Sequence, residues 1–135
     1  MIPGVRSFIR RMSSIIPQVP DVDIDESGVF KYILVKLKSS GEEKLIVRGY
    51  GECPYHADID DKLSDQLKKL KTGGAIVDCE TEVLGGGRIE HTPEKKYIKV
   101  YGYSQGFGKA NHEDTVKILK TKYPEYNITW SNGGY

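Results

Sequence analysis

A chain of 135 residues with 38% hydrophobic side chains has the size and apolar content of one globular domain. No apolar run approaches the roughly 18 residues of a membrane span, and a formal charge of +1 argues against a protein that binds nucleic acid by neutralising phosphates. Two cysteines, Cys53 and Cys79, provide no disulfide framework. We therefore expect an intracellular monomer that binds neither nucleic acid nor membrane.

The first 20 residues carry Arg6, Arg10 and Arg11 and no acidic side chain. Interspersed Ile, Val, Phe and Ser give this leader the composition of a mitochondrial presequence, and a disordered extension explains it equally well. We expect a cytoplasmic protein, with the mitochondrion as the alternative, and a domain over residues 21–135.

Beyond the leader the pattern begins with strands. Residues 29–37 (VFKYILVKL) are β-branched and aromatic and carry apolar residues at both parities, which is typical of a strand covered on both faces. Residues 44–50 follow a turn and form the second strand of a hairpin. From residue 56 to 71 the apolar residues recur at helical spacing, and this stripe consists of Ile59, Leu63, Leu67 and Leu70. Gly73 and Gly74 end the predicted helix.

The second half of the chain repeats this alternation. Further strands are predicted at 75–84, near 88–92, at 96–103 and at 126–130. Three glycines, 85–87, form the connection between the first two of these strands. A second helix begins at Asn111, which can cap it with Asp114 at the capping-box position, and ends before Pro124. Six strands and two helices indicate an α+β domain with one helix for each face of a single sheet.

His56 is the first candidate for chemistry. It follows Pro54, which is favoured at the first position of a helix, so the imidazole falls in the first helical turn. The positive end of the helix dipole disfavours the imidazolium, and a neutral ring has the lone pair that a nucleophile or general base requires. The N–H groups of this turn can also bind a phosphate oxygen. A histidine near a helix start is nevertheless more often a structural residue.

Cations in or beside the predicted strands are the second signal. Lys31 interrupts an otherwise apolar strand, and burying an unpaired ammonium costs several kcal/mol, so its amine either reaches solvent or faces a bound anion. Arg48 and Arg88 occupy comparable positions. Taken singly, each cation is explained by a surface charge or an ion pair; together they supply the charge that a phosphoryl group needs.

The segment YGYSQGFGKAN, residues 101–111, runs from a predicted strand into the second helix. Its glycines allow close backbone approach and Ser104 adds a hydroxyl, as phosphate-binding loops require. Tyr103 and Ala110 stand where a Walker A loop has glycine and Ser/Thr, which argues against a nucleotide hydrolase.

Metal and thiol sites are less well supported. The spacing of Cys53, His56, Cys79 and His91 matches no common zinc pattern. Neither cysteine is followed six residues later by the arginine of a cysteine-phosphatase loop. We therefore expect no metal and no other cofactor.

Six motifs occur in a characteristic order: DVDIDESGVFKYILVKL, IVRGY, YHADI, GGGRI, KVYGYSQGFGKA and KYPEYNITWSNGGY. In this order and spacing they resemble the protein-histidine phosphatase family, which includes the janus and ocnus proteins, from about residue 20 to the C-terminus. The resemblance implies a mixed six-stranded sheet flanked by two helices. It also implies metal-independent hydrolysis of the P–N bond of phosphohistidine in proteins, and leaves phospholysine open as a further substrate.

The resemblance also assigns residues. The catalytic histidine of the family's His-Ala-Asp motif falls on His56, as nucleophile or general base. Substrate-binding roles fall on Lys31, Ser104, Gln105, Gly106, Arg48 and Arg88. Some family members have Met-Ala in place of Gln105-Gly106, so the binding implied there is through the backbone. The alternative is a non-catalytic module that uses the same residues to bind phosphorylated partners.

Overall fold

A computed structural model describes residues 18–132 of the chain, so the predictions for residues 1–17 lie outside the described residues. The elements in chain order are β1 (Val22–Ile24), β2 (Gly28–Ser39), β3 (Glu42–Gly49), α2 (His56–Thr72), β4 (Glu80–Thr92), the 3-10 turn η1 (Pro93–Lys95), β5 (Tyr97–Tyr101), α3 (His112–Lys122) and β6 (Asn127–Trp130). Neither helix of the described range is long and apolar enough to cross a membrane.

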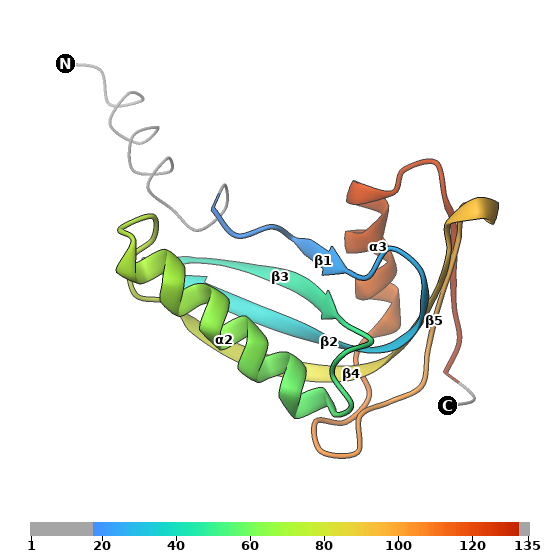
Figure 1. Ribbon diagram of the computed structural model, residues 1–135, viewed down its shortest axis with the longest axis horizontal. Coiled ribbons are helices and arrows are strands. Elements are labelled where there is room, and N and C mark those ends of the chain that lie inside the picture. The colour runs from blue at the N-terminus through green and yellow to red at the C-terminus, as the bar shows by residue number, and fades with distance from the viewer. Residues whose placement is uncertain (1–17, 133–135) are drawn as a thin grey trace.

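The strands form one sheet in the order β1-β3-β2-β4-β5-β6. The central pairs are antiparallel, while the outer pairs β1–β3 and β5–β6 are parallel, so the sheet is mixed. The sheet is curled, and α2 and α3 lie on its opposite faces (Figure 1). The predicted α+β class with a mixed six-stranded sheet and two helices is confirmed.

The strand boundaries differ from the prediction in three places. Residues 80–92 form the single strand β4, so the glycines 85–87 lie inside a strand and were wrongly predicted as a connection. Residues 75–79, predicted as strand, have no regular structure. The short strand β1 was not predicted, because three residues give no periodicity and its pairing partner lies about 25 positions away, for example Val47 for Val22.

The helices follow the local signals closely. Ile59, Leu63 and Leu67 are buried along one side of α2, as their spacing predicted. The first helical residue is His56, with Tyr55 as the N-cap, so Pro54 precedes the helix although His56 still lies in its first turn. The Asp58 carboxylate accepts a hydrogen bond from the Tyr55 N–H at 3.1 Å. In α3 the predicted cap is confirmed, since the Asn111 side chain accepts from the N–H of Asp114.

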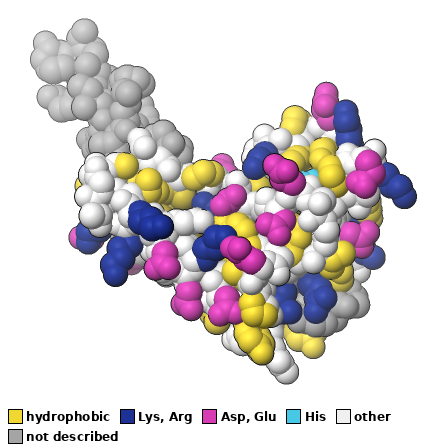
Figure 2. Space-filling view, viewed as in Figure 1, with side chains coloured by type: hydrophobic (Ala, Val, Ile, Leu, Met, Phe, Trp, Pro, Cys, Tyr) yellow, Lys and Arg dark blue, Asp and Glu magenta, His cyan; other side chains and the backbone are white. Residues whose placement is uncertain are grey.

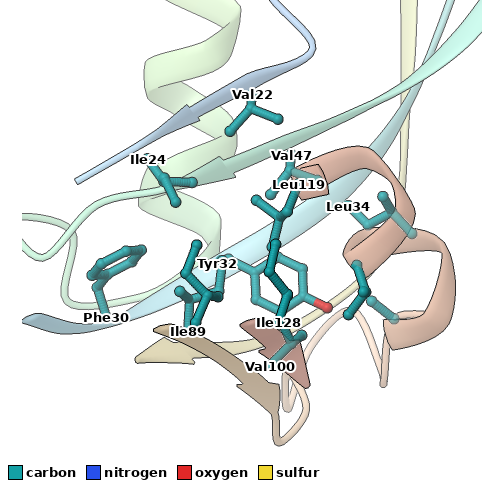
Figure 3. Close-up of a cluster of buried hydrophobic side chains, with 13 residues drawn as sticks. Val22, Ile24, Phe30, Tyr32, Leu34, Val47, Ile89, Val100, Leu119 and Ile128 are labelled. Atoms are coloured by element: carbon teal, nitrogen blue, oxygen red, sulfur yellow. The ribbon is translucent and has the colours of Figure 1, made fainter. Parts of the chain in front are cut away.

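Two buried clusters hold the helices on the sheet. Alternate residues of β2 point to opposite faces, so Phe30, Tyr32 and Leu34 pack toward α3 whereas Ile33, Val35 and Leu37 pack toward α2. Figure 3 shows the first cluster, in which Leu119 of α3 lies over Tyr32 and Val47. Outside these clusters, basic and acidic side chains are interspersed on the face seen in Figure 2. With the helices packed in this way, the ends of α2 and of the central strands are available to form a site.

Candidate functional site

One pocket gathers residues from three distant segments. It lies between β2, the N-terminus of α2 and the loop that joins β5 to α3, and its lining consists of Lys31, Tyr55, His56, Ala57, Ser104, Gln105, Gly106 and Phe107. Five of the seven residues proposed from the sequence therefore line one pocket. Arg88 stands beside it, because its backbone pairs directly with that of Lys31.

The His56 ring has a defined tautomer. Only 7% of the residue is exposed, and Nε2 lies 3.0 Å from the Gly87 carbonyl oxygen. A carbonyl can only accept, so Nε2 carries the proton and Nδ1 of the neutral ring carries the lone pair. Burial lowers the pKa of His56, as do the charges of Lys31 and Arg88, while the bond to Gly87 acts in the opposite direction. The ring is therefore neutral near pH 7, as the sequence predicted.

Glycine is required where this ring meets the sheet. A Cβ atom added to Gly86 would lie 2.8 Å from Cδ2 of His56 and 3.1 Å from the Ser104 Cβ. At Gly85 it would lie 2.6 Å from the backbone nitrogen of Ala110. These glycines thus allow the imidazole and the 104–110 loop to approach the middle of β4, which explains their place inside a strand.

Backbone hydrogen bonds give the loop a fixed shape. The Ser104 and Gly108 backbones bond to each other in both directions, at 3.0 and 2.8 Å. Gly86 joins the loop to β4, since its N–H donates to the Gly108 carbonyl and its carbonyl accepts from Ala110. The Ser104 hydroxyl oxygen accepts from the N–H of Phe107 and retains its own proton for donation.

The tip of this loop offers further donors. The N–H groups of Gln105 and Gly106 make no hydrogen bond within residues 18–132. Both residues line the pocket. With the Ser104 hydroxyl they present several donors to one small volume, which suits an anion with several oxygens.

The cations complete the electrostatics of the pocket. Lys31 is half-buried, and its ammonium group forms no ion pair or hydrogen bond with another described residue. Arg88 is its direct neighbour across the β2–β4 pair and shares the same face of the sheet. Two positive charges therefore lie beside the donors of the loop.

Arg48 does not reach this pocket. It is 1% exposed, and its guanidinium donates to the carbonyl oxygens of Val47 at 3.0 Å and Pro20 at 2.8 Å. Burial lowers its pKa, while Tyr50, Asp23 and Asp21 act in the opposite direction. The structure therefore does not bring Arg48 together with the other predicted cations. Its side chain ties the segment before β1 to β3, because unpaired backbone carbonyls beside a short edge strand need donors.

The other two histidines have both ring nitrogens occupied. In His112, Nε2 donates to the Gly102 carbonyl at 2.8 Å, and Nδ1 lies 2.6 Å from the Tyr32 hydroxyl. In His91, Nδ1 donates to the Asp25 carbonyl and Nε2 lies 3.2 Å from the Tyr126 hydroxyl. His112, a buried residue beside the glycine loop, was not predicted from the sequence; its position at a predicted helix start was the available signal.

The residues considered for zinc are not brought together. His91 lies on the α3 face, where it contacts Tyr123 and Tyr126, whereas His56 lies on the α2 face. Within residues 18–132 no three His, Cys, Asp or Glu side chains are close enough to share a metal ion. Cys53 and Cys79 are free, and burial raises the pKa of both thiols.

The chain is similar in sequence to several known proteins. The model of the Janus/Ocnus family matches residues 16–127. The chain is 48% identical to the sex-regulated protein janus-A of Drosophila yakuba over 98% of this chain and 93% of that protein. It is 46% identical to janus-A of Drosophila melanogaster over the same shares. It is 47% identical to the 14 kDa phosphohistidine phosphatase of Sus scrofa over 87% of this chain and 94% of that protein.

Proposed function

The chain belongs to the Janus/Ocnus family, and from this membership and the pocket geometry we propose that it is a phosphatase that hydrolyses the P–N bond of phosphohistidine in proteins. One observation carries the proposal: a neutral, buried His56 lines a pocket with Lys31 and unbonded backbone donors, and its Nδ1 makes no hydrogen bond within residues 18–132. A recognition module needs the cations and donors but has no use for such a nitrogen.

Nδ1 of His56 can act in two ways. It attacks phosphorus directly while the P–N bond of the substrate breaks, and water then hydrolyses phospho-His56 to release phosphate. Alternatively, it accepts a proton from the water that attacks phosphorus. In both routes the electron pair of the broken bond goes to the imidazole nitrogen of the substrate, which leaves as neutral imidazole once protonated. The bond from Nε2 to Gly87 fixes the ring so that the same atom serves both routes.

The remaining pocket residues hold the phosphoryl group. Lys31, the Ser104 hydroxyl and the N–H groups of Gln105 and Gly106 bind the non-bridging oxygens, and Arg88 adds positive charge beside Lys31. Donors that are already in place when charge develops are usually the largest contribution to lowering the barrier. Because the loop is bonded internally and to β4, these donors are held without the substrate. Arg48 serves the fold in this proposal.

The test is turnover of a chemically phosphorylated histidine peptide, followed as free phosphate. We expect the wild type to turn over and His56→Ala to lose about 10²- to 10⁴-fold in kcat. Since the pKa of His56 is lowered, kcat should hold at pH 7 and fall only as the pH drops below the ordinary histidine value of about 6.5. Saturable binding without turnover in the wild type would identify the module instead.

Rapid quenching with ³²P-labelled substrate separates the two routes. Acid-labile label on the wild-type protein at early times, absent from His56→Ala, identifies the phospho-His56 route. Release of phosphate without any labelled protein identifies the general-base route. Near wild-type turnover by His56→Ala would contradict the proposed function in either form.

A further inference from the structure

Helix α2 covers only part of its face of the sheet. It packs on β2 and β3, whereas α3 packs on the other face against β1, β3, β5 and β6. On the α2 side, β5, β6 and the end of β4 carry no helix within residues 18–132. Figure 1 shows the loop between β5 and α3 beside the N-terminal end of α2, so the pocket lies where the covered part of this face ends.

The strand register shows which residues occupy the uncovered part. Val29 of β2 pairs with Glu90, which pairs with Lys99, which in turn pairs with Thr129 of β6. The adjacent row joins Lys31, Arg88 and Tyr101 in the same manner. Directly paired residues share a face, and Lys31 lines the pocket, so both rows lie on the α2 side. We name Val29, Glu90, Lys99, Tyr101 and Thr129 the open face.

Burial along the strands confirms that this surface faces solvent. Val29 is 54% exposed, Lys99 and Thr129 are exposed, and Glu90 and Tyr101 are half-buried. Their neighbours of opposite parity, Ile89, Ile98 and Val100, are fully buried under α3. The alternation is that of a sheet with one solvated side. On that side Val29 is exposed, and the centroid of the half-buried Tyr101 ring lies 5.3 Å from the Lys99 ammonium.

We propose that the open face binds the polypeptide on either side of the phosphorylated residue; this rests on the proposed phosphatase function. The face is continuous with the pocket through Lys31 and Arg88, so a chain whose side chain enters the pocket can run along it. Outside Lys31 and Arg88, which serve the phosphoryl group, the open face carries one cation, Lys99, paired across the strands with the carboxylate-bearing Glu90. The exposed Lys99 can pair with an acidic residue near the phosphorylated side chain, while Val29 and Tyr101 provide apolar contact.

The experiment compares a large and a small substrate of the same chemistry. The large one is a histidine-containing polypeptide with acidic flanking residues, phosphorylated chemically with phosphoramidate, and the small one is phosphoramidate itself. Val29→Ser and Lys99→Glu change the open face outside the pocket lining. Val77→Ser is the matched control for the first, since Val77 is 53% exposed and lies outside this face. Lys117→Glu on α3 makes the same charge change as the second.

We expect both open-face variants to raise KM for the polypeptide about threefold or more while kcat and KM for phosphoramidate stay unchanged. The controls should match the wild type with both substrates. Unchanged polypeptide KM in both open-face variants would overturn the docking proposal, and so would an equal rise with phosphoramidate, because the change would then lie in the pocket.

Failure of the phosphatase function itself gives a different result, namely no turnover of either substrate by the wild type. In that case the binding of the phosphorylated polypeptide, titrated with and without Val29→Ser and Lys99→Glu, decides the docking proposal alone. Weaker binding than in the two controls supports it, and equal binding overturns it.

Discussion

Two histidines begin the two helices, one on each face of the sheet, and both pack against the glycines of β4. A Cβ atom at Gly86 would meet His56, and one at Gly87 would lie 2.8 Å from Cε1 of His112. Burial lowers the pKa of both rings, and both donate from Nε2 to a backbone carbonyl. They differ at Nδ1, which in His112 accepts from Tyr32 and in His56, a lining residue of the pocket, has no hydrogen bond within the described residues. Burial, charge state and helix position are therefore insufficient to identify a catalytic histidine. The distinguishing feature is whether the second ring nitrogen, Nδ1, already has a hydrogen-bond partner within the protein.

Exchanging each ring for glutamine tests this difference most strongly, because the amide can still donate as Nε2 does but has no counterpart of Nδ1. His56→Gln should lose about 10²- to 10⁴-fold in kcat and change the unfolding free energy little. His112→Gln should lose about 1 kcal/mol of unfolding free energy, because the buried Tyr32 hydroxyl loses one of its two partners and keeps only the Thr115 hydroxyl at 3.0 Å.

Urea unfolding and phosphate release measure both variants of this pair. The activity that remains in His112→Gln should keep the wild-type pH profile, since the proton chemistry lies at His56. A shifted pH profile in His112→Gln, or a large stability loss confined to His56→Gln, would reverse the assignment of roles.

The tyrosines that contact the other two histidines provide a finer comparison. Tyr32 is fully buried and its hydroxyl lies 2.6 Å from His112, whereas Tyr126 is half-buried and 3.2 Å from His91. Tyr32→Phe should cost about 1–2 kcal/mol of unfolding free energy, and Tyr126→Phe less than about 1 kcal/mol because water can replace it. Urea titration of both variants checks the order, and an equal cost would show that burial of the pair is unimportant.

The helix caps beside the two histidines should give the smallest effects. Asp58→Ala and Asn111→Ala each remove one side-chain acceptor from a helix start, at a cost of about 1 kcal/mol. Only Asp58→Ala should also lower kcat, by a few-fold, because it loosens the turn that carries His56. Asp58→Asn should restore kcat, since its amide oxygen can accept from Tyr55. Equal kcat in the two alanine variants would show that the cap does not position His56.

Local signals in the sequence were sufficient to predict the two helices and to single out individual candidate residues of the pocket. The spacing of Ile59, Leu63 and Leu67 and the cap at Asn111 depend on neighbours within four residues, and both are confirmed. The motif resemblance predicted that one site contains His56, Lys31 and Ser104. No local pattern could predict this, because these residues lie far apart in the sequence.

The errors arose where a residue serves a distant partner. Glycines in a row are typical of a turn, yet Gly86 and Gly87 lie inside β4 because side chains from two helices pack on them. Arg48 had the sequence context of a phosphate-binding cation, but its acceptor is the Pro20 carbonyl, 28 residues earlier. Whether a buried donor faces a ligand or the backbone is settled only by the fold.

The bond from Arg48 to Pro20 has a consequence for how far the chain can be shortened. The Pro20 carbonyl accepts from Arg48 and the Asp21 carbonyl from the Val47 N–H, while Val19 is buried in the cluster under α2. A chain that begins at Gln18 retains all three contacts. One that begins at Asp25 leaves a buried guanidinium short of an acceptor and the edge of β3 unpaired. The contacts that hold this edge of the sheet therefore extend ahead of the first strand, to Val19.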